Sequence, residues 1–253
     1  MTTVSTGKSP SGRNPLAAAE AADKKRKIAI QVGVAAVLVA LVAAIGIGIA
    51  VKQSDSGTST SAAQLPATGG AVTETGTVVI GNPDAKVKVR VVADLQCPAC
   101  KQFEAANGET LAKAAADGTA SVEYQIISFL DKASTNQYSS RAANASFCVA
   151  KSDTTKYQSW LQTMFEKQPA EGGAGLSNDE LVQIATDVGY TDPAVATCIE
   201  DKPYNDYIQQ VTQTTLQSGV ESTPSVYING RLNQTDAIFT ENGLAPVIAD
   251  AAK

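Results

Sequence analysis

The chain has 253 residues, a formal net charge of −5, four cysteines and no histidine. Its length suits one or two domains, and its 43% hydrophobic and 18% charged residues exclude a broadly disordered or collagen-like chain. Without histidine there can be no Ser-His-Asp or Cys-His triad, no histidine-ligated zinc and no haem held by a proximal histidine. The acidic balance argues against nucleic acid as the main partner.

The N-terminal part of the chain differs from the rest in charge and hydrophobicity. Residues 1–51 carry a net charge of +4 and the remainder −9, and the 24 residues at 28–51 contain no charge. A helix of that length spans about 36 Å, which exceeds the roughly 30 Å of a bilayer core. The basic cluster at 24–27 precedes it. By the positive-inside rule, this pattern predicts a cytoplasmic tail at 1–27 and a single transmembrane anchor at 28–51.

The alternative to an anchor is a cleaved signal peptide. The apolar core of a signal peptide runs roughly 7–15 residues, whereas this one is much longer. The segment at 61–63 (Ser-Ala-Ala) loosely fits a cleavage site, but it lies far beyond the apolar run. We therefore expect an uncleaved anchor and a single-pass protein of the cell membrane, with everything after the anchor outside the cytoplasm. Residues 52–72, rich in Ser, Thr, Ala and Gly, are predicted to be a flexible linker.

The exported part begins with alternating strand and helix signals. A short β-rich run predicts a strand at 77–80, and alternating valines predict a second strand at 86–92. The Cys-Pro-Ala-Cys segment at 97–100 opens a helix that Gly118 ends. A further strand is expected at 121–130. This order places the two cysteines between a strand and a helix.

The next part of the chain, at about 131–218, has a helical period and reads as an insertion of five or so helices. A capping box at 177–180 and the Asp-Pro pair at 192–193 mark two of the helix starts. A strand is expected at 225–228, followed by an Asn-Gly hairpin turn and a last helix at 240–252. A strand–helix core with a helical insertion is an α/β or α+β arrangement.

Cys97 and Cys100 carry the chemistry that the sequence predicts. They lie three residues apart at the start of a helix, so that their sulfurs can close a small disulfide ring. Unpaired N–H groups and a partial positive charge at a helix N-terminus favour a thiolate, most of all at Cys97. A stabilised thiolate favours the reduced form and makes the disulfide a better oxidant. Pro98 suits the first helical turn, where its missing N–H has no partner.

Three other interpretations of this C-x-x-C motif are weaker. Half of a zinc site would need a second C-x-x-C or histidines, and the chain has neither, so no metal is expected. A purely structural disulfide across so tight a loop would stabilise the fold little. Two free buried thiols are disfavoured in an oxidising compartment. We therefore expect a redox-active disulfide and no further cofactor.

Three segments together carry a family signature. They are Gly-Asn-Pro-Asp-Ala at 81–85, Asp-Leu-Gln-Cys-Pro-Ala-Cys at 94–100, and Gly-Val-Glu-Ser-Thr-Pro-Ser-Val-Tyr-Ile-Asn-Gly at 219–230. They resemble the DsbA-like thioredoxin family, including its membrane-anchored actinobacterial members. The resemblance covers 73–253 and implies a thioredoxin-like α/β fold with a helical insertion at about 131–218. C-P-x-C alone is moderately specific, whereas its pairing with the downstream G-V-x-S-T-P is highly specific.

The resemblance also implies site residues. Family members place a cis-proline opposite the cysteines, which here is Pro224, with Thr223 before it; both would orient a substrate strand. A cis bond exposes neighbouring backbone groups to an incoming peptide. Without the cysteine motif, an ordinary trans bond would be expected there. Many members have histidine between the cysteines, whereas this chain has Ala99, which predicts a milder oxidant.

A further departure concerns a buried acid. Thioredoxin-like proteins often bury an acid six residues before the first cysteine, and Val91 occupies that position here. Asp94 is nearer to the motif, but an aspartate there more often caps a turn. Both faces of a central strand should be covered, so charged side chains are unexpected there. This strand nevertheless carries the basic residues Lys86, Lys88 and Arg90.

The remaining cysteines, Cys148 and Cys198, lie 50 residues apart on two predicted helices of the insertion. Four cysteines allow three pairings, and the local motif pairs the other two with each other. Some actinobacterial relatives carry a second, structural disulfide in this domain, and this pair is similar. The alternative is a second redox pair that relays electrons, although neither cysteine belongs to a C-x-x-C motif.

These inferences predict a membrane-tethered thiol:disulfide oxidoreductase that oxidises exported proteins through Cys97 and Cys100. The implied partners are reduced exported proteins and a membrane reoxidant of DsbB-like or vitamin K epoxide reductase-like type. A disulfide isomerase or reductase of the same fold is the alternative within this class. From other classes, a non-catalytic peptide-binding or chaperone module and, more weakly, a metallochaperone stay open.

Overall fold

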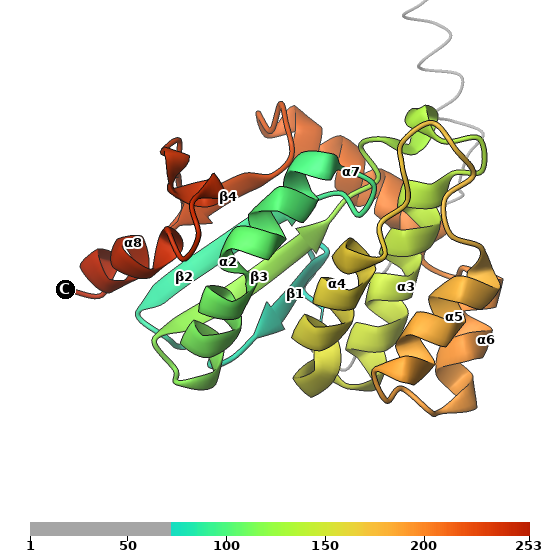
Figure 1. Ribbon diagram of the computed structural model, residues 1–253, viewed down its shortest axis with the longest axis horizontal. Coiled ribbons are helices and arrows are strands. Elements are labelled where there is room, and N and C mark those ends of the chain that lie inside the picture. The colour runs from blue at the N-terminus through green and yellow to red at the C-terminus, as the bar shows by residue number, and fades with distance from the viewer. Residues whose placement is uncertain (1–71) are drawn as a thin grey trace, which may run out of the picture. The chain divides into compact units, whose positions relative to one another are not determined.

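The computed structural model describes residues 72–253. The predicted tail and anchor, and the predicted linker up to residue 71, lie outside the described residues. Within 72–253, no helix is both long enough and apolar enough to cross a bilayer. The described residues form a mixed five-stranded sheet with helices on both faces and a cluster of helices beside it (Figure 1).

The sheet has the strand order β1-β3-β2-β4-β5. Its strands are β1 (Thr77–Ile80), β2 (Val87–Ala93), β3 (Ala120–Ile126), β4 (Ser225–Ile228) and β5 (Arg231–Leu232). β2 and β3 are parallel and are joined by the helix α2 (Pro98–Ala116), whereas the other neighbouring pairs are antiparallel. This mixed sheet agrees with the expected thioredoxin-like α/β class. β2 is the central strand, so its carboxyl end delivers the cysteine motif to the middle of the sheet edge.

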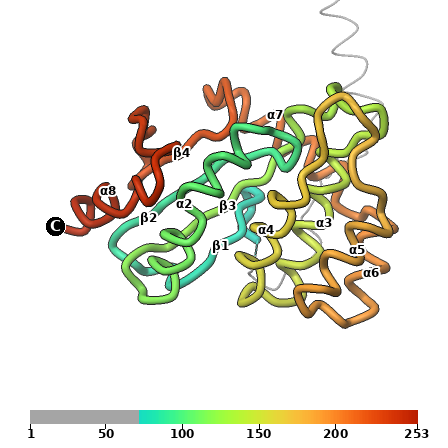
Figure 2. The backbone as a smooth tube through the Cα atoms, in the orientation of Figure 1, coloured from blue at the N-terminus to red at the C-terminus, as the bar shows by residue number. Residues whose placement is uncertain are grey.

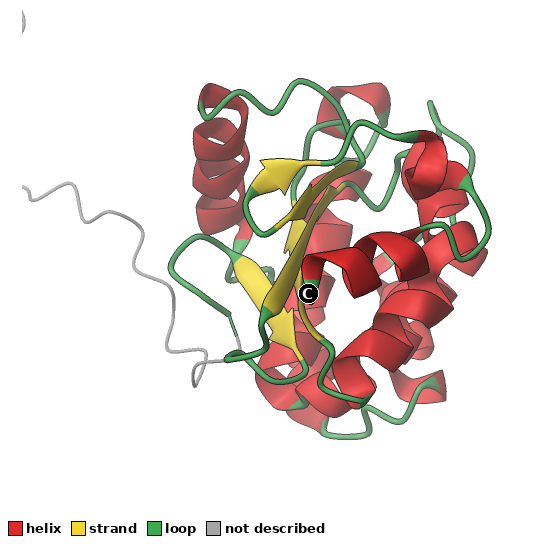
Figure 3. Ribbon diagram, turned by 90° about the vertical axis from the view of Figure 1, so that its left-hand side faces the viewer, coloured by secondary structure: helices red, strands yellow, loops and turns green. Residues whose placement is uncertain are grey.

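The two faces of the sheet are covered unequally. α2 and the C-terminal helix α8 (Leu244–Ala251) lie on one face, and α7 (Asn205–Gln217) lies on the other (Figure 3). On the α7 side, Lys88 is exposed and lies 4.0 Å from Glu123, and the Arg90 guanidinium stacks 4.3 Å over the Tyr227 ring. The basic side chains on a central strand therefore occupy a face that no helix fully covers.

The helical insertion leaves the sheet after β3 and returns through α7 to β4 (Figure 2). Its other helices are α3 (Tyr138–Ser152), α4 (Tyr157–Glu166), α5 (Asn178–Asp187) and α6 (Pro193–Asp201). They lie beside the sheet on the β1 side (Figure 1). Their packed interior is rich in aromatic side chains; its largest fully buried members are Trp160, Tyr138, Tyr157, Tyr204 and Phe147.

The structure confirms several helix starts and turns that were predicted from local sequence patterns. Ser177 and Glu180 form both halves of a capping box, and the Asp192 side chain caps α6. Asn229 and Gly230 both have positive φ, at 48° and 78°, as a tight hairpin turn requires. These signals are short-range, so the residues that carry them determine the local backbone directly.

Two element boundaries differ from the prediction. β3 ends at Ile126 rather than at 130, because the Ser128 N–H and hydroxyl bind the Thr212 hydroxyl of α7 instead of a strand. The last helix begins at Leu244 rather than at 240, and a separate 3₁₀ turn precedes it at Asp236–Phe239. Pro246 then falls in the first helical turn, where its missing N–H needs no partner.

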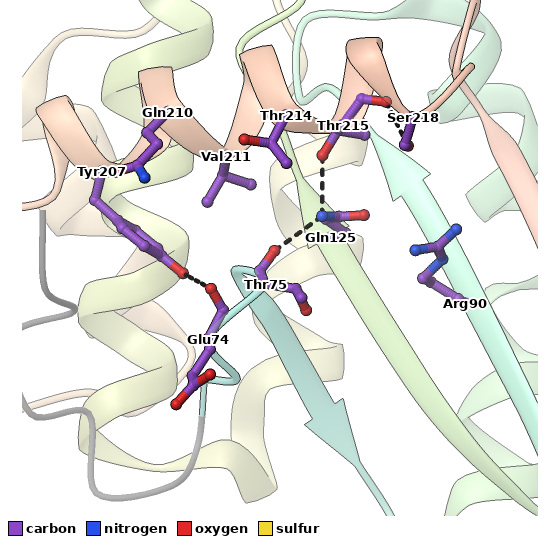
Figure 4. A pocket seen from close by; sticks show the side chains of 10 residues that line it. All are labelled: Glu74, Thr75, Arg90, Gln125, Tyr207, Gln210, Val211, Thr214, Thr215 and Ser218. Atoms are coloured by element: carbon purple, nitrogen blue, oxygen red, sulfur yellow. Dashed lines mark hydrogen bonds between the residues drawn. The ribbon is translucent and has the colours of Figure 1, made fainter. Parts of the chain in front are cut away.

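The Gln125 side chain of β3 is one of the contacts that attach α7 to the sheet. The buried Gln125 amide nitrogen donates to the Thr75 carbonyl at 2.9 Å and to the Thr215 hydroxyl at 3.0 Å (Figure 4). A pocket of about 310 Å³ lies between these groups, α7 and Arg90. None of its lining residues is a cysteine or belongs to the Thr223–Pro224 segment. We therefore assign this pocket to the packing of α7.

Candidate active site

The cysteine motif lies where β2 ends and α2 begins. Cys97 is the N-cap of α2, and Pro98 is the first helical residue. The Cys97 N–H donates to the Asp94 carbonyl at 3.0 Å, and the Cys97 carbonyl accepts from the Lys101 N–H at 3.2 Å. Pro98 is exposed and Ala99 is half-buried. This places the first sulfur at the helix N-terminus, where backbone N–H groups lack intrahelical partners.

The two sulfurs have different surroundings. Both cysteines are free thiols here; Cys97 is 7% exposed and Cys100 is 0% exposed. A hydrogen bond from the Cys100 thiol lowers the pKa of Cys97 to about 6, against the opposing effect of burial, with further help from Thr223 and the backbone of Cys100 and Ala99. Burial raises the pKa of Cys100 well above its ordinary value. The structure therefore pairs a slightly exposed cysteine of lowered pKa with a fully buried cysteine of raised pKa.

The predicted proline segment packs against this pair. The Thr223–Pro224 peptide bond is cis, as the family resemblance implies. The Cys97 thiol lies 3.3 Å from the Thr223 carbonyl oxygen, to which it donates. β4 pairs with β2 so that Ser225 lies opposite Val92, which brings the preceding residues to the end of β2. The pairing of β4 with β2 thus brings Cys97 and Thr223 together, although they are 126 positions apart in the sequence.

The Asp94 carboxylate makes more hydrogen bonds than a turn cap requires. It does accept from the Gln96 N–H at 2.8 Å, as an aspartate in a turn would. However, the side chain is 0% exposed, and it also accepts from the Leu130 N–H at 2.8 Å and from the Ser139 hydroxyl at 2.7 Å. Val91, where relatives often carry an acid, is a buried core residue.

Gln168, which follows α4, also holds the motif, and no sequence signal indicated it. Its amide nitrogen donates to the Leu95 carbonyl at 2.9 Å and to the Cys97 carbonyl at 3.0 Å. The insertion therefore supports the segment from Asp94 to Cys97 from two separate places. Because these contacts hold the loop, the Cys97 sulfur stays in one position relative to Thr223.

A second buried acid lies further along α2. Glu104 is 5% exposed and accepts from the Gln158 amide at 2.6 Å, while the Tyr124 hydroxyl lies 3.5 Å away. Burial raises the pKa of Glu104 to about 7. Gly108 leaves room for this side chain, because a Cβ there would lie 2.5 Å from its Oε1 atom.

We expect Glu104→Gln to stabilise the fold in a pH-dependent way. Because folding raises the pKa from 4.5 to about 7, the wild type is progressively destabilised, relative to a neutral side chain, as the pH rises across that window. The amide can keep both polar contacts without a buried charge. The variant should gain on the order of 3 kcal/mol over the wild type above pH 7 and lose that gain at pH 4. Urea unfolding at pH 4, 6 and 8 measures this difference; a gain independent of pH would contradict it.

Cys148 and Cys198 form a disulfide that joins α3 to α6 inside the insertion, with Cα atoms 5.8 Å apart. The pairing agrees with the one expected from the sequence. The Asn144 amide crosses the same two helices by donating to the Cys198 carbonyl at 3.2 Å. The disulfide and this hydrogen bond hold α3 and α6 together, and they leave Cys97 and Cys100 as the free pair.

Comparisons with known proteins agree with this geometry. The family model described as Thioredoxin matches residues 73–241. Oxidised DsbA of Mycobacterium tuberculosis is 30% identical, with a TM-score of 0.55 over 72% of this chain and 96% of that one. The "Disulfide bond formation protein D" of Bacillus subtilis is 24% identical, over 69% of this chain and 78% of its own.

A third relative matches only in part. The serine/threonine-protein kinase PknE of M. tuberculosis is 35% identical over 128 residues, which are 49% of this chain and 22% of the kinase. This chain thus spans about a fifth of that protein's length. The family model covers well over half of the present chain, and the fold, the cysteine pair and the adjoining cis-proline are all in place. The chain therefore belongs to the thioredoxin family, among its DsbA-like members.

Proposed function

We propose that this protein is a membrane-tethered thiol:disulfide oxidoreductase that introduces disulfides into exported proteins. The observation that carries the proposal is the asymmetry of the cysteine pair. Cys97 is 7% exposed and its pKa is lowered to about 6, whereas Cys100 is fully buried and its pKa is raised. A pair whose reduced form is stabilised in this way gives up its disulfide readily, as an oxidant must.

The reaction follows from that asymmetry in two exchanges. A substrate thiolate attacks the Cys97 sulfur of the Cys97–Cys100 disulfide, the S–S bond breaks, and Cys100 leaves and takes up a proton. A second substrate thiolate then attacks the substrate sulfur of the mixed disulfide and releases Cys97 as a thiolate. Two substrate thiols have lost two electrons and become a disulfide. The cysteine pair has gained those electrons.

Substrate orientation falls to the Thr223–Pro224 segment. Proline lacks an N–H, and the Thr223 carbonyl lies beside the reactive sulfur. An extended substrate strand could pair with backbone groups there and present its cysteine to Cys97. After each turnover a membrane partner of DsbB-like or vitamin K epoxide reductase-like type would accept the two electrons. The anchor at 28–51 would hold the enzyme near that partner.

An isomerase or reductase of the same fold is the second candidate. The residue between the cysteines is Ala99 rather than histidine, so Cys97 lacks one group that stabilises its thiolate in stronger oxidants. A peptide-binding module with an inert disulfide would fit the fold but would give no reason for a depressed pKa at Cys97. A low-pKa thiol is characteristic of a sulfur that reacts.

A stoichiometric transfer experiment tests the proposal. The oxidised full-length chain is mixed with an equimolar, reduced and unfolded protein that has two cysteines. We expect one disulfide to appear in the substrate for each Cys97–Cys100 pair reduced, as counted by alkylation and peptide mass. The pre-reduced chain is the control and should transfer nothing. A substrate that stays reduced while the enzyme pair stays oxidised would contradict the proposed function.

A further inference from the structure

Asp94 is the junction of three segments. Its Oδ1 atom accepts from the Gln96 N–H of the active-site loop and from the Ser139 hydroxyl of α3, and its Oδ2 atom accepts from the Leu130 N–H of the segment after β3. All three bonds are 2.7–2.8 Å long. The carboxylate therefore fixes the start of the cysteine loop to the helical insertion.

We propose that Asp94 is a positioning residue through which the helical insertion limits the oxidising strength of the Cys97–Cys100 pair. The inference deepens the proposed function and rests on it. The carboxylate holds the loop in place, and its negative charge opposes the thiolate that forms at Cys97 on reduction. Ser139 controls that charge, because its hydroxyl stabilises the ionised carboxylate.

The groups around the carboxylate support this assignment. From α2, the Cys97 charge acts on Asp94, whereas Cys100 interacts with the Asp94 backbone. From α3, the Tyr138 phenol has a raised pKa, mainly because it is buried and in smaller part because of the Asp94 charge. Within residues 72–253, no lysine or arginine forms an ion pair with Asp94. Hydrogen bonds are therefore the contacts that balance its charge, and the Cys97 charge acts on its pKa.

The pKa of the Asp94 carboxyl lies close to neutral pH. Burial raises the pKa of Asp94 to about 6, while its three hydrogen bonds lower it and the Cys97 charge raises it. Because the interaction is reciprocal, an ionised Asp94 also raises the pKa of Cys97. Removing the Ser139 hydrogen bond should raise the pKa of Asp94, leave more of it neutral at pH 7, and so favour the Cys97 thiolate.

The redox step has a defined balance. Two glutathione thiols supply two electrons to the Cys97–Cys100 disulfide and become glutathione disulfide. Of the two protons they release, Cys100 keeps one. The other goes to solvent or, in part, to Asp94, whose proton affinity rises when the Cys97 thiolate appears. The equilibrium with glutathione should therefore report the charge state of Asp94.

The structure offers a matched pair of serines for the test. Ser139 and Ser140 are neighbours on α3, are 0% and 2% exposed, and each donates its hydroxyl to a carboxylate. Ser139 binds Asp94, whereas Ser140 binds Asp131 at 2.6 Å. Replacing either by alanine removes one buried hydrogen bond from the same helical turn. Only Ser139→Ala removes a bond to the active-site loop.

The experiment measures the glutathione equilibrium of full-length wild type, Asp94→Asn, Ser139→Ala and Ser140→Ala from pH 5.5 to 8.5. Thiolate absorbance at 240 nm gives the titration of Cys97. At pH 7 we expect Asp94→Asn to shift the equilibrium toward the reduced pair by roughly three- to tenfold, with Cys97 titrating at lower pH. That shift should persist at pH 8.5. Ser139→Ala should shift it by about twofold near pH 7 and converge with wild type at pH 8.5, where Asp94 is ionised in both.

Ser140→Ala should match the wild type in both readouts at every pH. The inference is overturned if Ser139→Ala and Ser140→Ala behave alike, or if Asp94→Asn moves the titration of Cys97 upward or not at all. Should Asp94→Asn fail to fold, the two serine variants decide alone. A wild-type pair that never exchanges with glutathione would instead overturn the proposed function on which the inference rests.

Discussion

Replacing Cys97 by serine should reduce disulfide transfer to the uncatalysed rate. Cys97 is the less deeply buried member of the pair, its sulfur lies 3.3 Å from the Thr223 carbonyl, and its pKa is lowered to about 6. A serine hydroxyl can neither form a disulfide nor ionise there. Cys100→Ser should also abolish transfer, because no Cys97–Cys100 disulfide can form. When it is given a substrate disulfide instead, the Cys97 thiolate should attack it, release one substrate thiolate and form a mixed disulfide that persists because the Cys100 thiol is missing. Non-reducing gels and peptide mass measure both outcomes.

The matched control removes the other two cysteines. A Cys148→Ser, Cys198→Ser variant should still transfer disulfides, since that bridge lies within the insertion and joins α3 to α6. The assay is run below the temperature at which this variant unfolds. Transfer that survives Cys97→Ser but is lost in the control would assign the chemistry to the wrong pair and would contradict the account.

The same double variant should lose much of the domain's stability. The bridge closes a loop of 50 residues, and the chain-entropy model gives about 4 kcal/mol for a loop of that length. The cysteines are also packed in the insertion, where Cys148 is 2% exposed and partly covered by the Asn144 amide. We expect the free energy of unfolding to fall by about 4 kcal/mol, measured by urea denaturation at 25 °C.

A redox control separates this effect from the active site. Wild type and variant are compared with Cys97 and Cys100 alkylated, so that only the second bridge differs. A fall of less than about 1 kcal/mol would mean that the bridge constrains the unfolded chain little. That result would favour the alternative of an electron relay. Reduction of the Cys148–Cys198 bridge by the reduced Cys97–Cys100 pair would be the observation that supports the relay.

Short-range signals explain why much of the fold was predictable. The alternating valines of β2, the Cys-Pro start of α2, the Ser177 capping box and the Asn229-Gly230 turn each act within a few residues. The pairing of the cysteine motif with Thr223–Pro224 came from the family signature, since strand pairing brings them together across the sheet. No local pattern would have joined them.

The supporting residues of the site could not be found in this way. Asp94 meets Ser139 across 45 residues, and Gln168 meets Cys97 across 71. Such contacts depend on how the insertion packs against the sheet, and the period of a helix does not specify its packing partner. Glu104 is similar: on the sequence it is one charged residue of an amphipathic helix, and only its burial against Gln158 and Tyr124 distinguishes it.

The equilibrium reduction potential of the Cys97–Cys100 pair tests the central claim most directly. The full-length chain is equilibrated in glutathione buffers at pH 7, and each cysteine is followed by alkylation and peptide mass. The account predicts a potential of about −120 to −180 mV, as befits a protein that oxidises others. A value near about −270 mV would indicate a thioredoxin-like reductase, and a pair that never cycles would contradict redox catalysis altogether.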